Sequence, residues 1–89
     1  MEIDPRDASA SRLYYTMISL IVPRPIAWVY SRDAAGTPNL APYSYFTGVT
    51  SRPPTLCFAV GNKRDGRPKD TARNILATSS FVVNVVPHA

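Results

Sequence analysis

Two clusters of polar, charged and aromatic residues in this 89-residue chain have the composition of a small-molecule site. The first is Lys69-Asp70-Thr71, at the expected start of a helix. Free backbone N–H groups and the helix dipole favour an anion at such a position. A positive charge on Lys69 and a hydroxyl donor on Thr71 suit a phosphomonoester, and the preceding loop adds Lys63, Arg64 and Arg67. The alternative is an ordinary capped helix with surface lysines.

The second cluster is the stretch from Asn39 to Phe46, where backbone, amide, hydroxyl and ring groups follow one another closely. A planar heterocycle with a polar edge needs such a lining, because its faces stack on apolar groups while its rim takes donors and acceptors. The alternative is that Tyr43, Tyr45 and Phe46 are core or interface aromatics.

Arg24 is a third candidate, because Pro23 and Pro25 hold it in a stiff backbone. It could aim a guanidinium at a phosphate or a carbonyl, or brace a loop through an internal salt bridge, and spacing does not decide between these roles. The sequence offers no nucleophile–base pair and no metal-ligand cluster, so we expect no catalytic residue and no metal site. Any chemistry would then come from a bound cofactor.

Composition predicts one domain over residues 1–89, with 45% hydrophobic residues to build a core. No apolar run is long enough to span a membrane, and the acidic, mixed start does not resemble a signal peptide. We therefore expect a cytoplasmic protein without a membrane partner. The formal net charge is +4, and the whole excess lies between Arg52 and Arg73, which suggests an anionic ligand. Cys57, among apolar neighbours, is expected to be a small buried hydrophobe.

The elements that must position these clusters are short. A helix is expected over residues 10–20, ended by Pro23 and Pro25, and a second over 71–78 with Asp70 as its N-cap. Strands are expected over 26–30, 39–42, 43–50, 55–60 and 80–86, with a turn at 33–38 that makes a hairpin. Short connections favour antiparallel pairing. The pattern predicts a mainly β fold with two short helices, arranged as a barrel or half-barrel.

Five stretches of the sequence resemble the flavin reductase-like family. In chain order they are Ile21-Val22-Pro23-Arg24-Pro25-Ile26-Ala27-Trp28-Val29, Asn39-Leu40-Ala41-Pro42-Tyr43-Ser44-Tyr45-Phe46, Ser51-Arg52-Pro53-Pro54-Thr55, Lys69-Asp70-Thr71-Ala72-Arg73-Asn74-Ile75 and Phe81-Val82-Val83-Asn84-Val85-Val86. The resemblance implies an FMN-binding split β-barrel of Greek-key type, usually in a homodimer. Members are usually longer, so we expect this chain to correspond to the N-terminal half of one and its barrel to be incomplete.

The resemblance also implies a cofactor site and an activity. The cofactor would be FMN, with FAD in some members, and its ring would lie along the second cluster while its phosphate end meets the first. The implied cofactor-binding residues are Arg24, Asn39, Ala41, Pro42, Tyr43, Ser44, Tyr45, Phe46, Lys69, Asp70 and Thr71. The implied reaction is hydride transfer from NAD(P)H to the bound flavin, for a partner oxygenase or another electron acceptor.

Two other functions stay open from the sequence. One is a flavin-binding or flavin-shuttling module without turnover, because elements that normally receive the nicotinamide would follow this segment. The other is a barrel that binds single-stranded nucleic acid, suggested by basic residues near aromatic ones. We expect no nucleic-acid partner, since a tight basic loop before a helix suits one phosphate better than an extended backbone.

Overall fold

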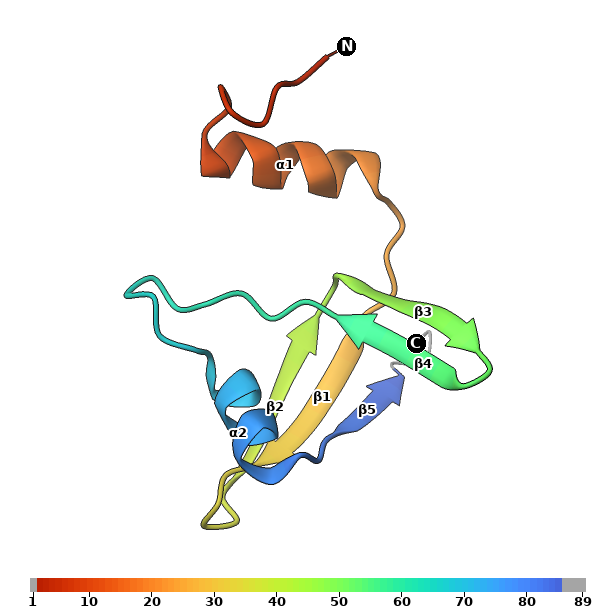
Figure 1. The fold of residues 1–89 in the computed structure, drawn as a ribbon, viewed down its shortest axis with the longest axis vertical. Helices are drawn as coiled ribbons and strands as arrows, with labels where there is room; N and C mark the ends of the chain where they lie inside the picture. Colours follow the sequence, from red (N-terminus) through yellow and green to blue (C-terminus); the bar gives the residue numbers. More distant parts are fainter. Residues whose placement is uncertain (1, 86–89) are drawn as a thin grey trace.

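The computed structural model describes residues 2–85, which form two helices and five strands (Figure 1). In chain order the elements are α1 (Ala10–Leu20), β1 (Ala27–Arg32), β2 (Pro38–Tyr43), β3 (Phe46–Ser51), β4 (Pro54–Phe58), α2 (Asp70–Thr78) and β5 (Val82–Val85). The strands make a three-stranded sheet in the order β2-β1-β5 and a separate two-stranded ribbon, β3-β4. The mainly β fold with two helices is confirmed, and the sheets do not close on each other within residues 2–85.

Strand β1 is the centre of the larger sheet. It pairs antiparallel with both neighbours, and Val29 lies opposite Ala41 on one side and Val83 on the other. Ala27 and Val29 are fully buried and form the core with Tyr43, because every second residue of β1 points toward α2. The expected hairpin between β1 and β2 is confirmed.

A carboxylate closes that hairpin. The Oδ1 atom of Asp33 accepts the backbone N–H groups of Thr37 at 2.8 Å and of Ala35 at 2.9 Å. Both bonds favour the ionised carboxylate and so lower the pKa of Asp33. The hydrogen bond from the Thr37 backbone is the largest cause of this lowering. The positive φ of Gly36, 90°, completes the turn at a residue without a side chain.

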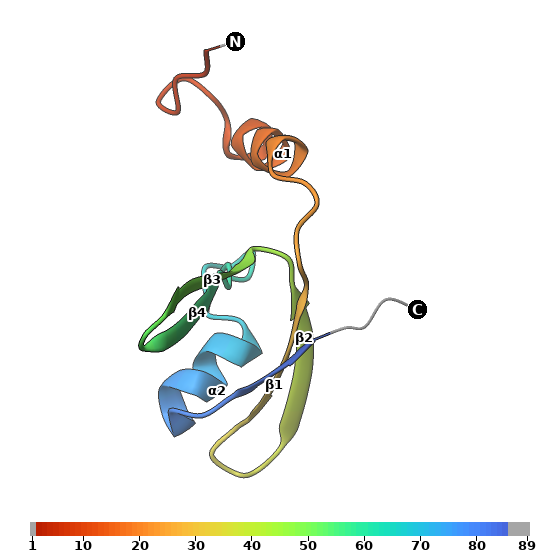
Figure 2. The same cartoon turned by 90° about the vertical axis from the view of Figure 1, so that its right-hand side faces the viewer.

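Helix α2 packs on the sheet, on the side where the β3-β4 ribbon also lies (Figure 2). Its buried face carries Asn74, whose Nδ2 donates to the Oγ of Ser31 on β1 at 3.2 Å. The helix begins one residue before the expected start, and Lys69, not Asp70, is its N-cap. The prediction of Asp70 as the cap was therefore wrong: its carboxylate points to basic side chains instead of bonding the first turn.

The expected continuous strand over residues 43–50 is also wrong, because the chain bends at Ser44-Tyr45 and leaves the first sheet. Tyr43 ends β2 and Phe46 begins β3. The prediction that Cys57 is buried is contradicted as well, since it is exposed. The reason is that the ribbon has no third layer over this part of β4 within residues 2–85, and β4 is exposed up to Phe58.

Helix α1 has the predicted bounds, and the side chain of Ser9 caps it by accepting the N–H of Arg12. None of its residues is buried, and Figures 1 and 2 show it set off from the strands. The linker over residues 21–26 joins it to β1. No helix in the described part of the chain is both long and apolar enough to cross a membrane.

The Ser31–Asn74 contact gives a test of how α2 is held. The change Ser31→Ala leaves the buried Nδ2 group of Asn74 without its acceptor, and such a loss costs about 1–3 kcal/mol. We expect the free energy of unfolding, measured by urea titration followed by circular dichroism, to fall by about that amount. Ser11→Ala, on the exposed surface of α1, is the matched control and should change it little. Equal stability of the two variants would contradict this packing.

Candidate functional site

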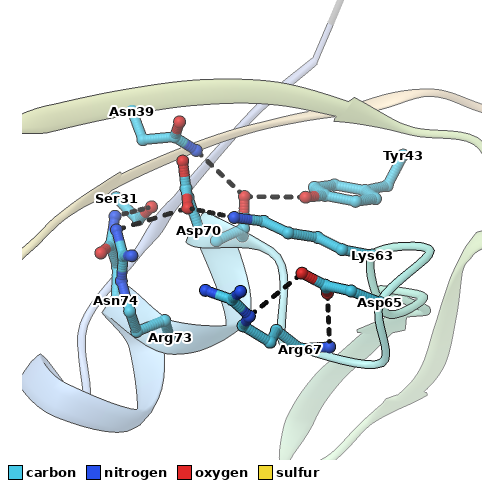
Figure 3. Close-up of polar contacts among 10 residues, drawn as sticks. Ser31, Asn39, Tyr43, Lys63, Asp65, Arg67, Asp70, Arg73 and Asn74 are labelled. Atoms are coloured by element: carbon cyan, nitrogen blue, oxygen red, sulfur yellow. Dashed lines mark hydrogen bonds and ion pairs between the residues drawn. The ribbon is translucent and has the colours of Figure 1, made fainter.

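The first turn of α2 is joined to β2 by one buried hydroxyl group. The Oγ1 atom of Thr71 accepts the hydroxyl of Tyr43 at 2.8 Å and the Nδ2 group of Asn39 at 3.1 Å (Figure 3). Thr71 is 1% exposed and Tyr43 is 8% exposed. Two segments that are far apart in the sequence, the Asn39–Phe46 stretch and the start of α2, are thereby brought together.

Lys69 lies beside this bridge. Its Nζ atom is 6.0 Å from the centroid of the Tyr43 ring, and its side chain is exposed. No side chain within residues 2–85 caps the start of α2, so the backbone N–H groups of the first turn keep their hydrogen-bonding capacity. A cation, free N–H groups and the positive end of the helix dipole thus meet at one place, which favours an anion.

The Asp70 carboxylate organises the other charges around the helix start. Its Oδ1 lies 3.4 Å from the Nζ of Lys63 and 3.4 Å from a terminal nitrogen of Arg73 (Figure 3). In the preceding loop Arg67 pairs with Asp65 at 3.0 Å. Lys69 makes no ion pair with any residue in the described part of the chain, so its charge is available to a ligand.

A cavity of about 500 Å³ joins the two predicted clusters. We call it the Lys69 cavity. Lys69 is on one side, and the end of β2 with the following bend is on the other. Its lining residues are Tyr14, Pro42, Tyr43, Ser44, Tyr45, Ala59, Gly61 and Lys69.

Arg24 lies at a neighbouring cavity of about 470 Å³, which we call the Arg24 cavity. Its Nη1 donates to the carbonyl oxygens of Ile18, at 2.8 Å, and Ile21, at 2.6 Å. Its guanidinium carbon is 5.7 Å from the centroid of the Tyr45 ring. The loop is therefore braced through carbonyl oxygens at the end of α1, and no ion pair to Arg24 exists within residues 2–85.

The structure places seven of the predicted site residues in two neighbouring cavities and the other four elsewhere. Pro42, Tyr43, Ser44, Tyr45 and Lys69 line the Lys69 cavity, while Arg24 and Phe46 line the Arg24 cavity, which Ser44 and Tyr45 also border. Asn39 and Thr71 face each other in the bridge, Ala41 packs against the core, and Asp70 points to Lys63 and Arg73.

Sequence reasoning missed three residues of the Lys69 cavity: Tyr14 on α1, and Ala59 and Gly61 after β4. An exposed tyrosine on an otherwise ordinary helix is a weak signal, and nothing in the sequence singles out the other two. No group of three or more His, Cys, Asp or Glu side chains that could hold a metal ion occurs in the described part of the chain.

Comparison with known proteins adds the family. The flavin reductase like domain matches residues 18–89. An uncharacterized protein of Halalkalibacterium halodurans is 43% identical over 86 residues, which are 97% of this chain and 41% of that protein. One of Aquifex aeolicus is 42% identical over 86 residues, covering 97% of this chain and 44% of that protein. The chain thus spans less than half the length of these relatives.

Two solved structures share the fold. The nitrilotriacetate monooxygenase component B from Bacillus cereus superposes with a TM-score of 0.86 at 38% identity, over 93% of this chain and 42% of that one. The Pseudomonas fluorescens 2-nitrobenzoate 2-nitroreductase gives a TM-score of 0.82 at 34% identity, over 98% of this chain and 41% of that one. The strands and helices described above are therefore part of a flavin reductase-like split barrel, and the chain belongs to the flavin reductase-like family.

Proposed function

We propose that this chain binds FMN in the Lys69 cavity as part of a flavin-dependent oxidoreductase. One observation carries the proposal: Tyr43 and Lys69, from the two clusters that the sequence sets apart, line the same cavity. An aromatic, partly polar wall and a cationic helix start are the two surfaces that a flavin with a phosphate tail requires.

The chemistry of the donor set fits the phosphate end. Lys69 would supply the positive charge, and the backbone N–H groups of Asp70 and Thr71 in the first turn of α2 would supply directed donors. The Thr71 hydroxyl accepts two hydrogen bonds that hold the helix start against β2, and its own O–H group would still be able to donate to the phosphate. A single anion site of this kind favours FMN over FAD.

The bend after β2 fits the ring end. Tyr43 and Tyr45 give the Lys69 cavity aromatic surface, Ser44 gives it a hydroxyl group, and Pro42 adds an apolar surface. Asn39 and Ala41 would act from behind, the first through the Thr71 bridge and the second through the core. Arg24 and Phe46 would border the cofactor from the neighbouring cavity.

When bound, the flavin supplies the redox chemistry, by accepting a hydride from a reduced nicotinamide. The residues of this chain would bind and orient it; none is required as a general base. Membership of the family supports the oxidoreductase part of the proposal. The structural neighbours are a monooxygenase component and a nitroreductase, which supports a partner oxygenase or another electron acceptor.

We also propose a homodimer, since apolar side chains such as Leu40 and Val85 are exposed on the larger sheet.

The phosphate contact gives the first test of this proposal. Lys69→Gln removes the cation but keeps a polar side chain of similar length, and hydrogen bonds to charged groups are strong enough that FMN affinity should fall about tenfold. Riboflavin, which lacks the phosphate, should bind both forms equally. Fluorescence titration of each flavin measures these affinities.

Lys63→Gln is the matched control for net charge, because Lys63 is paired with Asp70 and does not line the cavity. It should weaken FMN binding much less than Lys69→Gln. Equal effects of the two variants, or an equal loss of riboflavin and FMN, would contradict a phosphate held by Lys69.

A second test separates an oxidoreductase from a flavin carrier. The chain and a full-length relative are each assayed with saturating FMN and with NADH or NADPH. The loss of nicotinamide absorbance measures oxidation of the nicotinamide. If the protein is an oxidoreductase, we expect the relative to oxidise the nicotinamide in an FMN-dependent way. The substitution equivalent to Lys69→Gln in the relative should lower that rate. Flavin binding by the relative without nicotinamide oxidation would select the carrier.

A further inference from the structure

We propose that the Arg24 cavity is a second binding site, for a planar aromatic carboxylate. The cavity adjoins the Lys69 cavity, with Ser44, Tyr45 and Ala59 bordering both, but it does not include Lys69 or the start of α2. This second site uses neither Lys69 nor the start of α2, although Tyr45 borders both cavities.

The shape and surface of the cavity select a flat, mostly apolar molecule. Phe46 and Phe58 line it from the ribbon, Met17 lines it from α1, and Ile21 lines it from just after that helix. A volume of about 470 Å³ is in the range of small-molecule pockets. Aromatic walls favour aromatic ligands through offset stacking and edge contacts.

The charge of the cavity selects a carboxylate. Arg24 brings a guanidinium among these apolar side chains, and no acidic group within residues 2–85 pairs with it. Among the described residues, its Nη1 donates to two carbonyl oxygens, and its buried Nε has no hydrogen-bond partner there. A partly buried cation without an anion is costly, and a ligand carboxylate would offset that cost.

A second unpaired polar atom points to the same chemistry. The hydroxyl of Tyr45 is also buried and has no partner within residues 2–85, and the Arg24 guanidinium lies over the ring of this tyrosine. A carboxylate has two oxygens, one for the Nε–H group and one for the hydroxyl. Both atoms are shielded from water, so a ligand would have to displace part of the cavity wall to reach them. The wall formed by α1 has no buried residue and is held at this point by the bonds from Arg24 to the Ile18 and Ile21 carbonyl oxygens.

The test is a titration with 2-naphthoate, followed by calorimetry and by backbone amide shifts. Arg24→Gln should weaken binding about tenfold, by loss of a charged hydrogen-bond donor. Tyr45→Phe, which keeps the ring, should weaken it severalfold. Arg64→Gln, in the exposed loop, is the matched charge control and should bind like the unaltered chain. Shifts should centre on Phe46, Cys57 and Phe58.

Three results would overturn the proposal. The first is equal binding of 2-naphthoate by the unaltered chain, Arg24→Gln and Tyr45→Phe, and the second is equal affinity of the unaltered chain for 2-naphthoate and for the neutral 2-naphthylmethanol. The third is weaker binding of 2-naphthoate by Lys69→Gln, which would place the ligand in the Lys69 cavity. If Arg24→Gln disturbs α1, Tyr45→Phe and the neutral alcohol still decide. FMN titration of the same samples separates the two proposals. Binding of 2-naphthoate without binding of FMN contradicts only the flavin site, and binding of FMN without binding of 2-naphthoate contradicts only the carboxylate site.

Discussion

The buried hydroxyl of Thr71 is the contact on which the candidate site depends. By accepting hydrogen bonds from Asn39 and Tyr43 it fixes the start of α2 against β2. Lys69 precedes that helix, so its charge comes to lie beside the Tyr43 ring. Without this bridge the cation and the aromatic wall would belong to separate surfaces. The Ser31–Asn74 contact holds the next turn of the same helix, so α2 is attached to the sheet by polar groups as much as by apolar ones.

Much of this was predictable because the signals are local. The two prolines after Ile21 end α1, and turn residues after Arg32 define the β1-β2 hairpin. The anion-binding character of the start of α2 follows from backbone geometry, even though the cap proved to be Lys69 instead of Asp70. The family resemblance, which rests on several motifs in order, is confirmed over most of the chain.

What could not be predicted depends on contacts between distant residues. The bend at Ser44-Tyr45 arises where Tyr43 is bonded to α2 and the next residues join a different sheet. Strand periodicity does not register this change, so it wrongly predicts one continuous strand across the bend. Cys57 is exposed because nothing covers its strand within residues 2–85, which its apolar neighbours do not reveal. Arg24 braces the end of α1 through carbonyl oxygens, an interaction that leaves no trace in side-chain types. Local patterns therefore predicted the surfaces, but not their arrangement.

The central claim is that one phosphate-bearing planar ligand spans the bend and the helix start. Backbone amide spectra recorded during titration with FMN, and separately with riboflavin, test it most directly. We expect FMN to shift the amides of Asp70 and Thr71 together with those of Ser44 and Tyr45, and riboflavin to shift only the amides of Ser44 and Tyr45. Amides of Asp70 and Thr71 that do not move at saturating FMN would contradict it.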